Sequence, residues 1–74
     1  MPSNGKYRIR VTNAEGQEFI FTLSEGKSIL KKIGGLGHGI YLYDGESIKE
    51  NDTCDSLDMK KGKIYYIDWI KTNL

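Results

Sequence analysis

Two short runs near the start of the chain alternate strictly between polar and apolar residues, and this alternation constrains the fold most. They cover residues 6–12 and 18–23, and residues 13–16 between them read Asn-Ala-Glu-Gly. A period of two places alternate side chains on opposite faces of a strand, and Asn and Gly tolerate the backbone of tight turns. The apolar members that share one face are Tyr7, Ile9, Val11, Phe19, Phe21 and Leu23. The sequence therefore predicts a β-hairpin with one apolar and one wet face.

Size and composition restrict the class of protein and the kinds of partner to expect. A chain of 74 residues with 38% hydrophobic and 11% aromatic residues is long enough for one folded domain and too apolar for a disordered one. No apolar run approaches the roughly 18 residues that a membrane-spanning helix requires, so no membrane partner is expected. A formal net charge of +1 makes nucleic acid an unlikely main partner.

The first residues and the single cysteine indicate the cellular compartment to expect. Residues 1–5 have neither the basic start nor the apolar stretch of a signal peptide, and we expect them to be flexible. Cys54 alone excludes an internal disulfide and most structural zinc sites. An intracellular location, in the cytoplasm or nucleus, is the expectation.

A short helix is expected after the hairpin. Ser24 or Ser28 suits its N-cap, and Ile29, Leu30 and Ile33 form an apolar stripe of about two turns. Gly34 suits the left-handed residue that follows many helices. Residues 34–39 contain four glycines and are expected to form a loose connector.

The second half of the chain predicts two more strand regions around a capped turn. Residues 40–43 form a third strand, a brief fourth strand lies near Ile48, and Asp52 or Thr53 caps a single turn. Residues 63–70 form the last strand. Because a lone carboxylate belongs in water, Asp68 sets the register of this strand. The side chains then expected to face the helix are Tyr65, Ile67 and Trp69.

This order of elements resembles the β-grasp fold of ubiquitin-like proteins, and the second half is most similar to the SUMO branch. Residues 43–48 (Tyr-Asp-Gly-Glu-Ser-Ile) resemble the aromatic-acid-Gly-x-x-Ile turn of that branch, and residues 51–53, 57–59 and 62–64 continue it at matching spacing. The resemblance implies an α+β ubiquitin-like domain over residues 6–70. Its mixed sheet would have four to five strands packed on one short helix, with Leu36, Tyr41 and Trp69 filling the space that longer helices cover. Residues 71–74 would form a tail.

The resemblance also implies a receptor-binding patch on the outer face of the sheet. The matching positions are Leu42, Tyr66 and Asp68, and the apolar residues expected on the same face are Ile20, Ile40, Ile64 and Ile70. Asp68 places a charge where ubiquitin has an apolar residue, so ubiquitin's own receptors should bind poorly. The alternative is a face with scattered apolar residues and no partner, which is common on protein surfaces.

A second implied surface is the edge of the sheet at residues 18–23. SUMO-like proteins accept an extended peptide between this strand and the helix. Ile20 and Thr22 would line or flank the groove, and Lys31 and Lys32 would attract acidic residues beside the peptide motif. An ordinary protected edge strand is the alternative.

Other motifs indicate no catalysis and no cofactor. The glycine-rich residues 35–39 lack the Gly-Lys-Ser/Thr ending of a phosphate loop and follow a helix, whereas a phosphate loop precedes one. His38 has no second metal ligand nearby in the sequence, and a nucleophilic Cys54 would need His38 as its base. We expect a protein that is not an enzyme.

The expected function is a non-covalent protein–protein interaction module. Conjugated relatives end in Gly-Gly, whereas this sequence ends Lys-Thr-Asn-Leu, and its one Gly-Gly pair is internal at Gly34-Gly35. A modifier whose Gly-Gly tail lies outside this sequence remains an alternative, and a free ubiquitin-like assembly factor is a narrower form of the same function. A small nucleic-acid-binding protein using Lys6, Arg8 and Arg10 is the third, although these residues also fit an ordinary solvated strand face.

Overall fold

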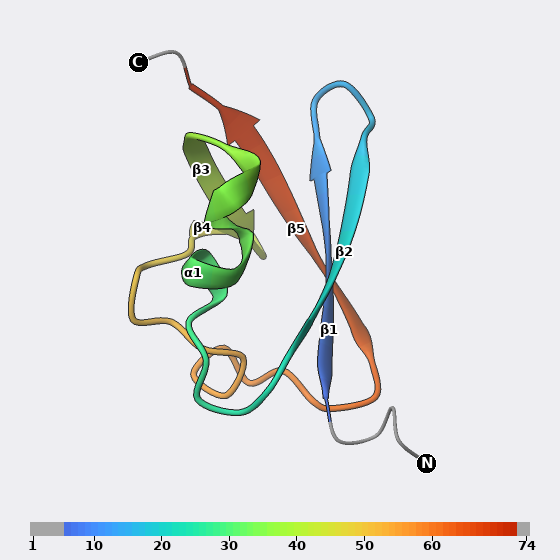
Figure 1. The fold of residues 1–74 in the computed structure, drawn as a ribbon, viewed down its shortest axis with the longest axis vertical. Coiled ribbons are helices and arrows are strands. Elements are labelled where there is room, and N and C mark those ends of the chain that lie inside the picture. Colours follow the sequence, from blue (N-terminus) through green and yellow to red (C-terminus); the bar gives the residue numbers. More distant parts are fainter. Residues whose placement is uncertain (1–5, 73–74) are drawn as a thin grey trace.

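The computed structural model describes residues 6–72, which form one mixed β-sheet with a short helix on one side (Figure 1). The expected flexible segment 1–5 and the last two residues of the expected tail lie outside the described residues. The elements, in chain order, are β1 (Tyr7–Asn13), β2 (Glu18–Leu23), α1 (Ile29–Ile33), the 3₁₀ turn η2 (Gly34–Leu36), β3 (Gly39–Tyr43), β4 (Glu46–Ser47) and β5 (Ile64–Lys71). The predicted α+β class with one short helix is confirmed.

The sheet has five strands in the order β2-β1-β5-β3-β4. β1 pairs antiparallel with β2 and parallel with β5, and β3 pairs antiparallel with both β5 and β4. The central position therefore belongs to β5, which ends the chain, and β2 and β4 are the two edges. A parallel pair needs a crossover connection, and the chain between β1 and β5 supplies it through the helix and residues 44–63.

The hairpin forms as predicted, and one side chain fixes its turn. Oδ1 of the buried Asn13 accepts hydrogen bonds from the backbone N–H groups of Glu15 (3.1 Å) and Gln17 (3.0 Å). Gly16 has φ +84°, which few other residues adopt without strain. In the resulting register Tyr7 lies opposite Leu23, so the apolar residues of both strands share the helix side of the sheet.

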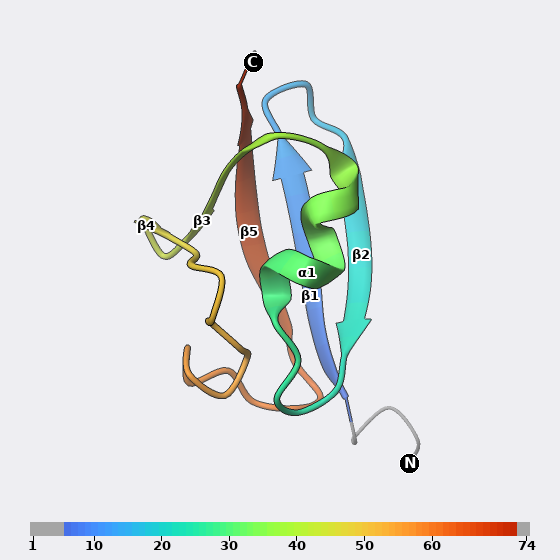
Figure 2. The same ribbon diagram turned by 60° about the vertical axis from the view of Figure 1, so that its left-hand side comes forward.

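The helix begins at Ser28, one of the two predicted caps. Its hydroxyl accepts a hydrogen bond from the N–H of Lys31 (3.3 Å) and donates one to the carbonyl of Glu50 (2.8 Å). Ile29 and Ile33 are fully buried against the sheet, and this docking stabilises a helix too short to form alone. Figure 2 shows α1 lying across β1 and β2.

The prediction for the end of the helix is wrong in one respect. Gly34 has a right-handed conformation (φ −60°) and starts the 3₁₀ turn η2, so the chain coils for three more residues before it loosens. The first glycine with positive φ after the helix is Gly37 (+144°). The half-buried Leu36 packs against the core, which favours continued coiling over an early stop.

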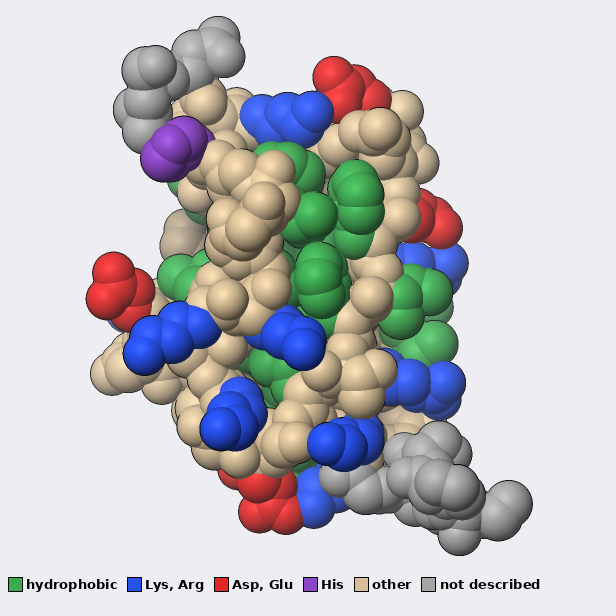
Figure 3. All heavy atoms as spheres, in the orientation of Figure 1, with side chains coloured by type: hydrophobic (Ala, Val, Ile, Leu, Met, Phe, Trp, Pro, Cys, Tyr) green, Lys and Arg blue, Asp and Glu red, His purple; other side chains and the backbone are tan. Residues whose placement is uncertain are grey.

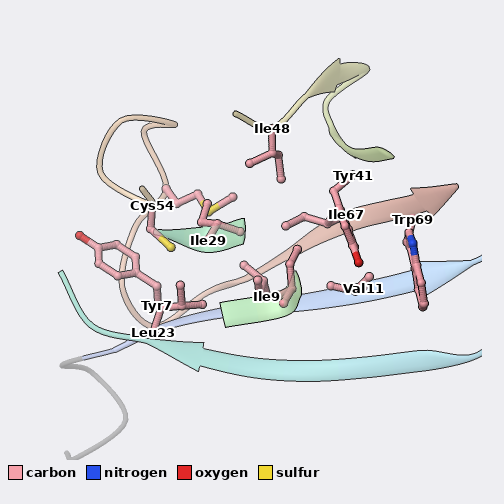
Figure 4. Packing of buried hydrophobic residues seen from close by; sticks show 12 residues of the cluster. Tyr7, Ile9, Val11, Leu23, Ile29, Tyr41, Ile48, Cys54, Ile67 and Trp69 are labelled. Carbon is pink, nitrogen blue, oxygen red and sulfur yellow. The ribbon is translucent and has the colours of Figure 1, made fainter. Parts of the chain in front are cut away.

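A cluster of buried side chains lies between the sheet and the helix (Figure 4). Its main members are Ile9, Val11, Leu23, Ile29, Ile33, Tyr41, Ile48, Cys54, Met59, Ile67 and Trp69. Tyr41 stacks on Trp69 with ring centroids 5.7 Å apart, and Phe19 meets the indole edge-on at 6.3 Å. Aromatic rings thus fill the part of the core beyond the short helix, as predicted.

Residues 44–63 contain only β4 and a series of turns, yet they close the other end of the core. The N–H of Ile48 donates to the carbonyl of Tyr41 (2.7 Å), which carries the chain inward after β4. Thr53 caps the following turn through its hydroxyl, which accepts from the N–H of Ser56 (3.1 Å). The hydroxyl of Tyr7 donates to Asp55 and ties this segment to β1.

β5 has the predicted register and runs one residue further than expected, because Lys71 still pairs with Gly39. Ile67 and Trp69 are buried, whereas Tyr66 and Asp68 are exposed. Within residues 6–72, no helix combines the length and apolar character needed to cross a membrane.

Candidate interaction surfaces

The helix and η2 lie on one side of the sheet, which leaves the opposite side without a covering layer (Figures 1 and 2). Two surfaces follow from this arrangement. We call the uncovered side the outer face, and the space between β2, the following loop and α1 the edge groove. The predicted site residues divide between these two surfaces.

On the outer face, the register brings two of the predicted patch residues together. Leu42 of β3 lies directly opposite Asp68 of β5, and Ile40 lies opposite Ile70 one pair further along. Ile40 and Ile70 are exposed, and Leu42 is half-buried. The third patch residue, Tyr66, is 58% exposed and precedes Asp68 by two residues on the same strand face.

Ile20 is separated from the rest of the predicted patch. Arg10 of β1 lies between Ile20 of β2 and Tyr66 of β5 in the same cross-strand row. The guanidinium of Arg10 stands 4.8 Å from the centre of the Tyr66 ring and pairs with Glu18 at 3.2 Å. The outer face is therefore a mosaic in which a cation interrupts the apolar residues.

The predicted basic stripe is also divided. Arg8 and Arg10 stay on the outer face, where Arg8 donates a long hydrogen bond to the carbonyl of Gly62 (3.5 Å). Nζ of Lys6 instead donates to Oγ of Ser24 (2.8 Å), which turns this lysine towards the edge groove. Tyr66 is an exposed aromatic residue on the outer face, and it lies beside Arg10. Tyr7 is buried on the helix side of the sheet.

The edge groove contains a basic recess of about 350 Å³ between the end of β2, the loop at residues 24–28 and α1. Its lining includes the predicted Thr22, Lys31 and Lys32. Ile20 does not line it, because this side chain points to the outer face. Two more lysines, Lys6 and Lys27, complete the lining. Figure 3 shows Lys and Arg side chains around this lower part of the molecule.

The upper part of the edge groove is apolar. Phe19 and Phe21 of β2 are only partly buried, and so are Leu30 of α1 and Leu36 of η2. Figure 3 shows hydrophobic side chains at the surface between the helix and β2. β2 ends the strand order, so its backbone groups directed away from β1 have no strand partner within the described sheet.

Cys54 and His38, the nucleophile and base weighed from the sequence, lie in different environments. Cys54 is buried, and desolvation raises the pKa of its thiol to about 11, so the thiol stays protonated near neutral pH. His38 is exposed, and its backbone carbonyl accepts the indole N–H of Trp69 at 3.3 Å. Among residues 6–72, no group of three or more His, Cys, Asp or Glu side chains is arranged to hold a metal ion.

A second recess, of about 350 Å³, lies between the β3–β4 turn and the capped turn. Acidic side chains dominate its charged lining, namely Asp44, Glu46, Asp52 and Asp58. The sequence did not indicate this recess, because its shape depends on how two neighbouring turns fold against each other.

The chain matches no model of a known protein family, and no curated protein has a significantly similar sequence.

Proposed function

We propose that this chain is a ubiquitin-like β-grasp protein of the SUMO type and acts as a non-covalent protein–protein interaction module. The strand order, with a parallel pair formed by the first and last strands and a helix on one face, supports this assignment. The turn at residues 43–48, which resembles the SUMO branch, forms the β3–β4 connection and leads to the buried Ile48.

The observation that carries the function is an unpaired strand edge beside an apolar groove with a basic end. An extended peptide adding to β2 would satisfy the free backbone groups of the edge. Its apolar side chains would cover Phe19 and Phe21, which the helix leaves partly exposed. Acidic residues next to that apolar motif would reach Lys31 and Lys32 in the recess.

Non-covalent action requires no activated carboxylate. The internal Gly34-Gly35 pair is part of the η2 turn and serves the fold. If the protein were instead a conjugated modifier, antibodies against it would detect a ladder of mass-shifted products in cell extracts. A single band at the mass of the free protein would favour the interaction module.

The test of the edge groove uses a blocked peptide of four valine and isoleucine residues followed by three aspartates. We expect ¹H–¹⁵N spectra to show the largest shifts at residues 18–23 and in α1. Charge reversal of both Lys31 and Lys32 to Glu should weaken binding about tenfold, since each exposed ion pair contributes about 0.5–1 kcal/mol. Charge reversal of Lys49 and Lys60, exposed lysines outside the recess lining, is the matched control and should change little.

Two results would count against this function. The first is an absence of shifts at residues 18–23 with the acidic peptide. The second is equal binding of a peptide that carries three lysines in place of the aspartates, because a basic recess must discriminate between them.

Nucleic-acid binding is a second candidate because Tyr66 is exposed beside Arg10 on the same strand face as Arg8. Exposed aromatics next to arginines are the groups that stack on single-stranded bases. A titration of single-stranded oligonucleotides at increasing salt distinguishes this candidate. A steep loss of affinity with salt, removed by Tyr66→Ala, would favour nucleic acid over protein as the partner.

A further inference from the structure

A small recess opens on the outer face where three strands meet. Its volume is about 270 Å³, and its walls include Thr12 from the end of β1, Ala14 from the turn that follows, Leu42 from β3, and Asp68 and Ile70 from β5. Asp68 is flanked in the sheet by Leu42 on one side and Thr12 on the other. One carboxylate therefore lies in a mainly apolar depression.

This carboxylate has no cationic partner among residues 6–72, and the nearest candidates on the sheet are engaged elsewhere. Arg10 pairs with Glu18 at 3.2 Å and covers Tyr66. Lys71 pairs with Glu15 at 2.8 Å, and its ammonium lies 5.2 Å from the centre of the Trp69 ring. The surface thus offers an exposed negative charge that no described lysine or arginine neutralises.

We propose that this recess binds a lysine or arginine side chain of a second partner protein, a proposal that rests on the function as an interaction module. The methylene groups of such a side chain would cover Leu42 and Ile70 while its charged end pairs with Asp68. An apolar occupant would desolvate the Asp68 carboxylate without a partner, and an acidic occupant would be repelled. Charge complementarity therefore selects a basic side chain flanked by aliphatic ones.

This preference is opposite to that of the edge groove, where lysines select acidic residues. The edge groove opens on the helix side, and the Asp68 recess lies on the outer face. Because the sheet separates the two sites, one occupant does not block the other. The chain would then hold an acidic peptide and a basic partner at the same time.

The test uses two blocked pentapeptides, Leu-Ala-Arg-Ala-Leu and the same sequence with citrulline in place of arginine. Citrulline keeps the shape of the side chain and removes its charge. In ¹H–¹⁵N titrations at low salt, the arginine peptide should shift Leu42, Asp68 and Ile70 and bind about threefold or more tightly than the citrulline peptide. Asp68→Asn should abolish the difference between the two peptides.

Two variants serve as matched controls. Asp58→Asn removes an exposed carboxylate outside the recess and should leave the arginine preference unchanged; Asn tolerates the positive φ (+59°) found at this position. Asp68→Glu keeps the charge and should retain most of the preference.

The proposal is overturned if wild type binds both peptides equally, if the arginine peptide does not bind, or if its shifts fall on the edge groove instead. The acidic peptide described above, added to Asp68→Asn, separates this failure from failure of the proposed function. Normal edge-groove binding with no arginine preference in wild type would reject only the Asp68 recess. Loss of both in wild type would reject the interaction module itself.

Discussion

Isoleucine residues on the two faces of the same sheet differ widely in their exposure to solvent. Ile9 and Ile67 on the helix side are completely buried, whereas Ile20 and Ile70 on the outer face are 63% and 50% exposed. One five-residue helix, its 3₁₀ extension and the turns at residues 44–63 provide the whole covering layer. A chain this small can cover one face only. The covered isoleucines therefore stabilise the fold, whereas the outer ones stay accessible on the surface.

Alanine substitutions on the two faces of β5 are expected to differ widely in how much they lower the stability of the protein. Trp69→Ala empties a buried site between Tyr41 and Phe19 and should lower the free energy of unfolding by about 3–5 kcal/mol. Tyr66→Ala on the outer face should cost less than about 1 kcal/mol. Urea denaturation followed by circular dichroism measures both. Similar losses for the two variants would show that the faces do not differ.

A smaller loss of stability is expected for a substitution at Gly39, where the backbone approaches the indole of Trp69. Gly39 has φ +157°, and a Cβ atom there would lie 2.5 Å from Nε1 of Trp69 and closer still to the carbonyl oxygen of Ile70. Gly39→Ala should destabilise the protein by about 1–3 kcal/mol because of this overlap. Gly35→Ala, which meets nothing within 4 Å, is the control. In thermal unfolding it should melt at or slightly above the wild-type temperature.

A negative charge placed on each face gives a sharper comparison. Leu42→Asp should remove the apolar contact that the outer face offers and leave the fold intact, at a cost of up to about 1 kcal/mol from the like charge opposite at Asp68. Ile67→Asp should prevent folding, because it buries an unpaired carboxylate. Amide spectra report the fold, and the titration with the uncharged citrulline pentapeptide reports binding, because an added carboxylate would itself attract arginine. Unchanged binding by Leu42→Asp would reject the outer face as a docking surface.

The smallest expected effect is a pH dependence of folding stability that comes from Tyr7, on the helix side of the sheet. Its hydrogen bond to Asp55, followed by burial, raises the pKa of the phenol to about 12. The unfolded chain then releases this proton at lower pH than the folded one, so the tyrosine's contribution to stability is present below pH 10 and is lost towards pH 12. Tyr7→Phe should lose less stability than wild type between about pH 10 and pH 12, as judged by urea midpoints. A Tyr7→Phe decline parallel to wild type would contradict the linkage.

β1, β2 and β5 were predictable because each has a residue pattern that a single strand can express, whereas the fourth strand, expected near Ile48, lies at Glu46–Ser47. Strict alternation gave the faces of β1 and β2, and Asp68 alone fixed the face of every residue in β5. The cap at Ser28 and the packing of Tyr41 against Trp69 also followed from local residue choice and from the shortness of the helix.

Features that depend on neighbours distant in sequence were not predictable. The position of Arg10 between Ile20 and Tyr66 results from the pairing of three strands, and no pattern within one strand encodes it. Lys6 and Lys27 join the basic recess because the loop after β2 turns back beside them. Gly34 continues the coil because Leu36 gains contact with the core, which outweighs its preference for a left-handed stop.

The position of Trp69 gives this protein an intrinsic optical probe. It is the sole tryptophan of the sequence, and it stacks on Tyr41 and meets Phe19, which belongs to the strand bordering the edge groove. A ligand lying over Phe19 is one ring away from the indole. The emission of this one residue should therefore respond both to loss of the fold and to occupancy of that cleft, without any attached dye.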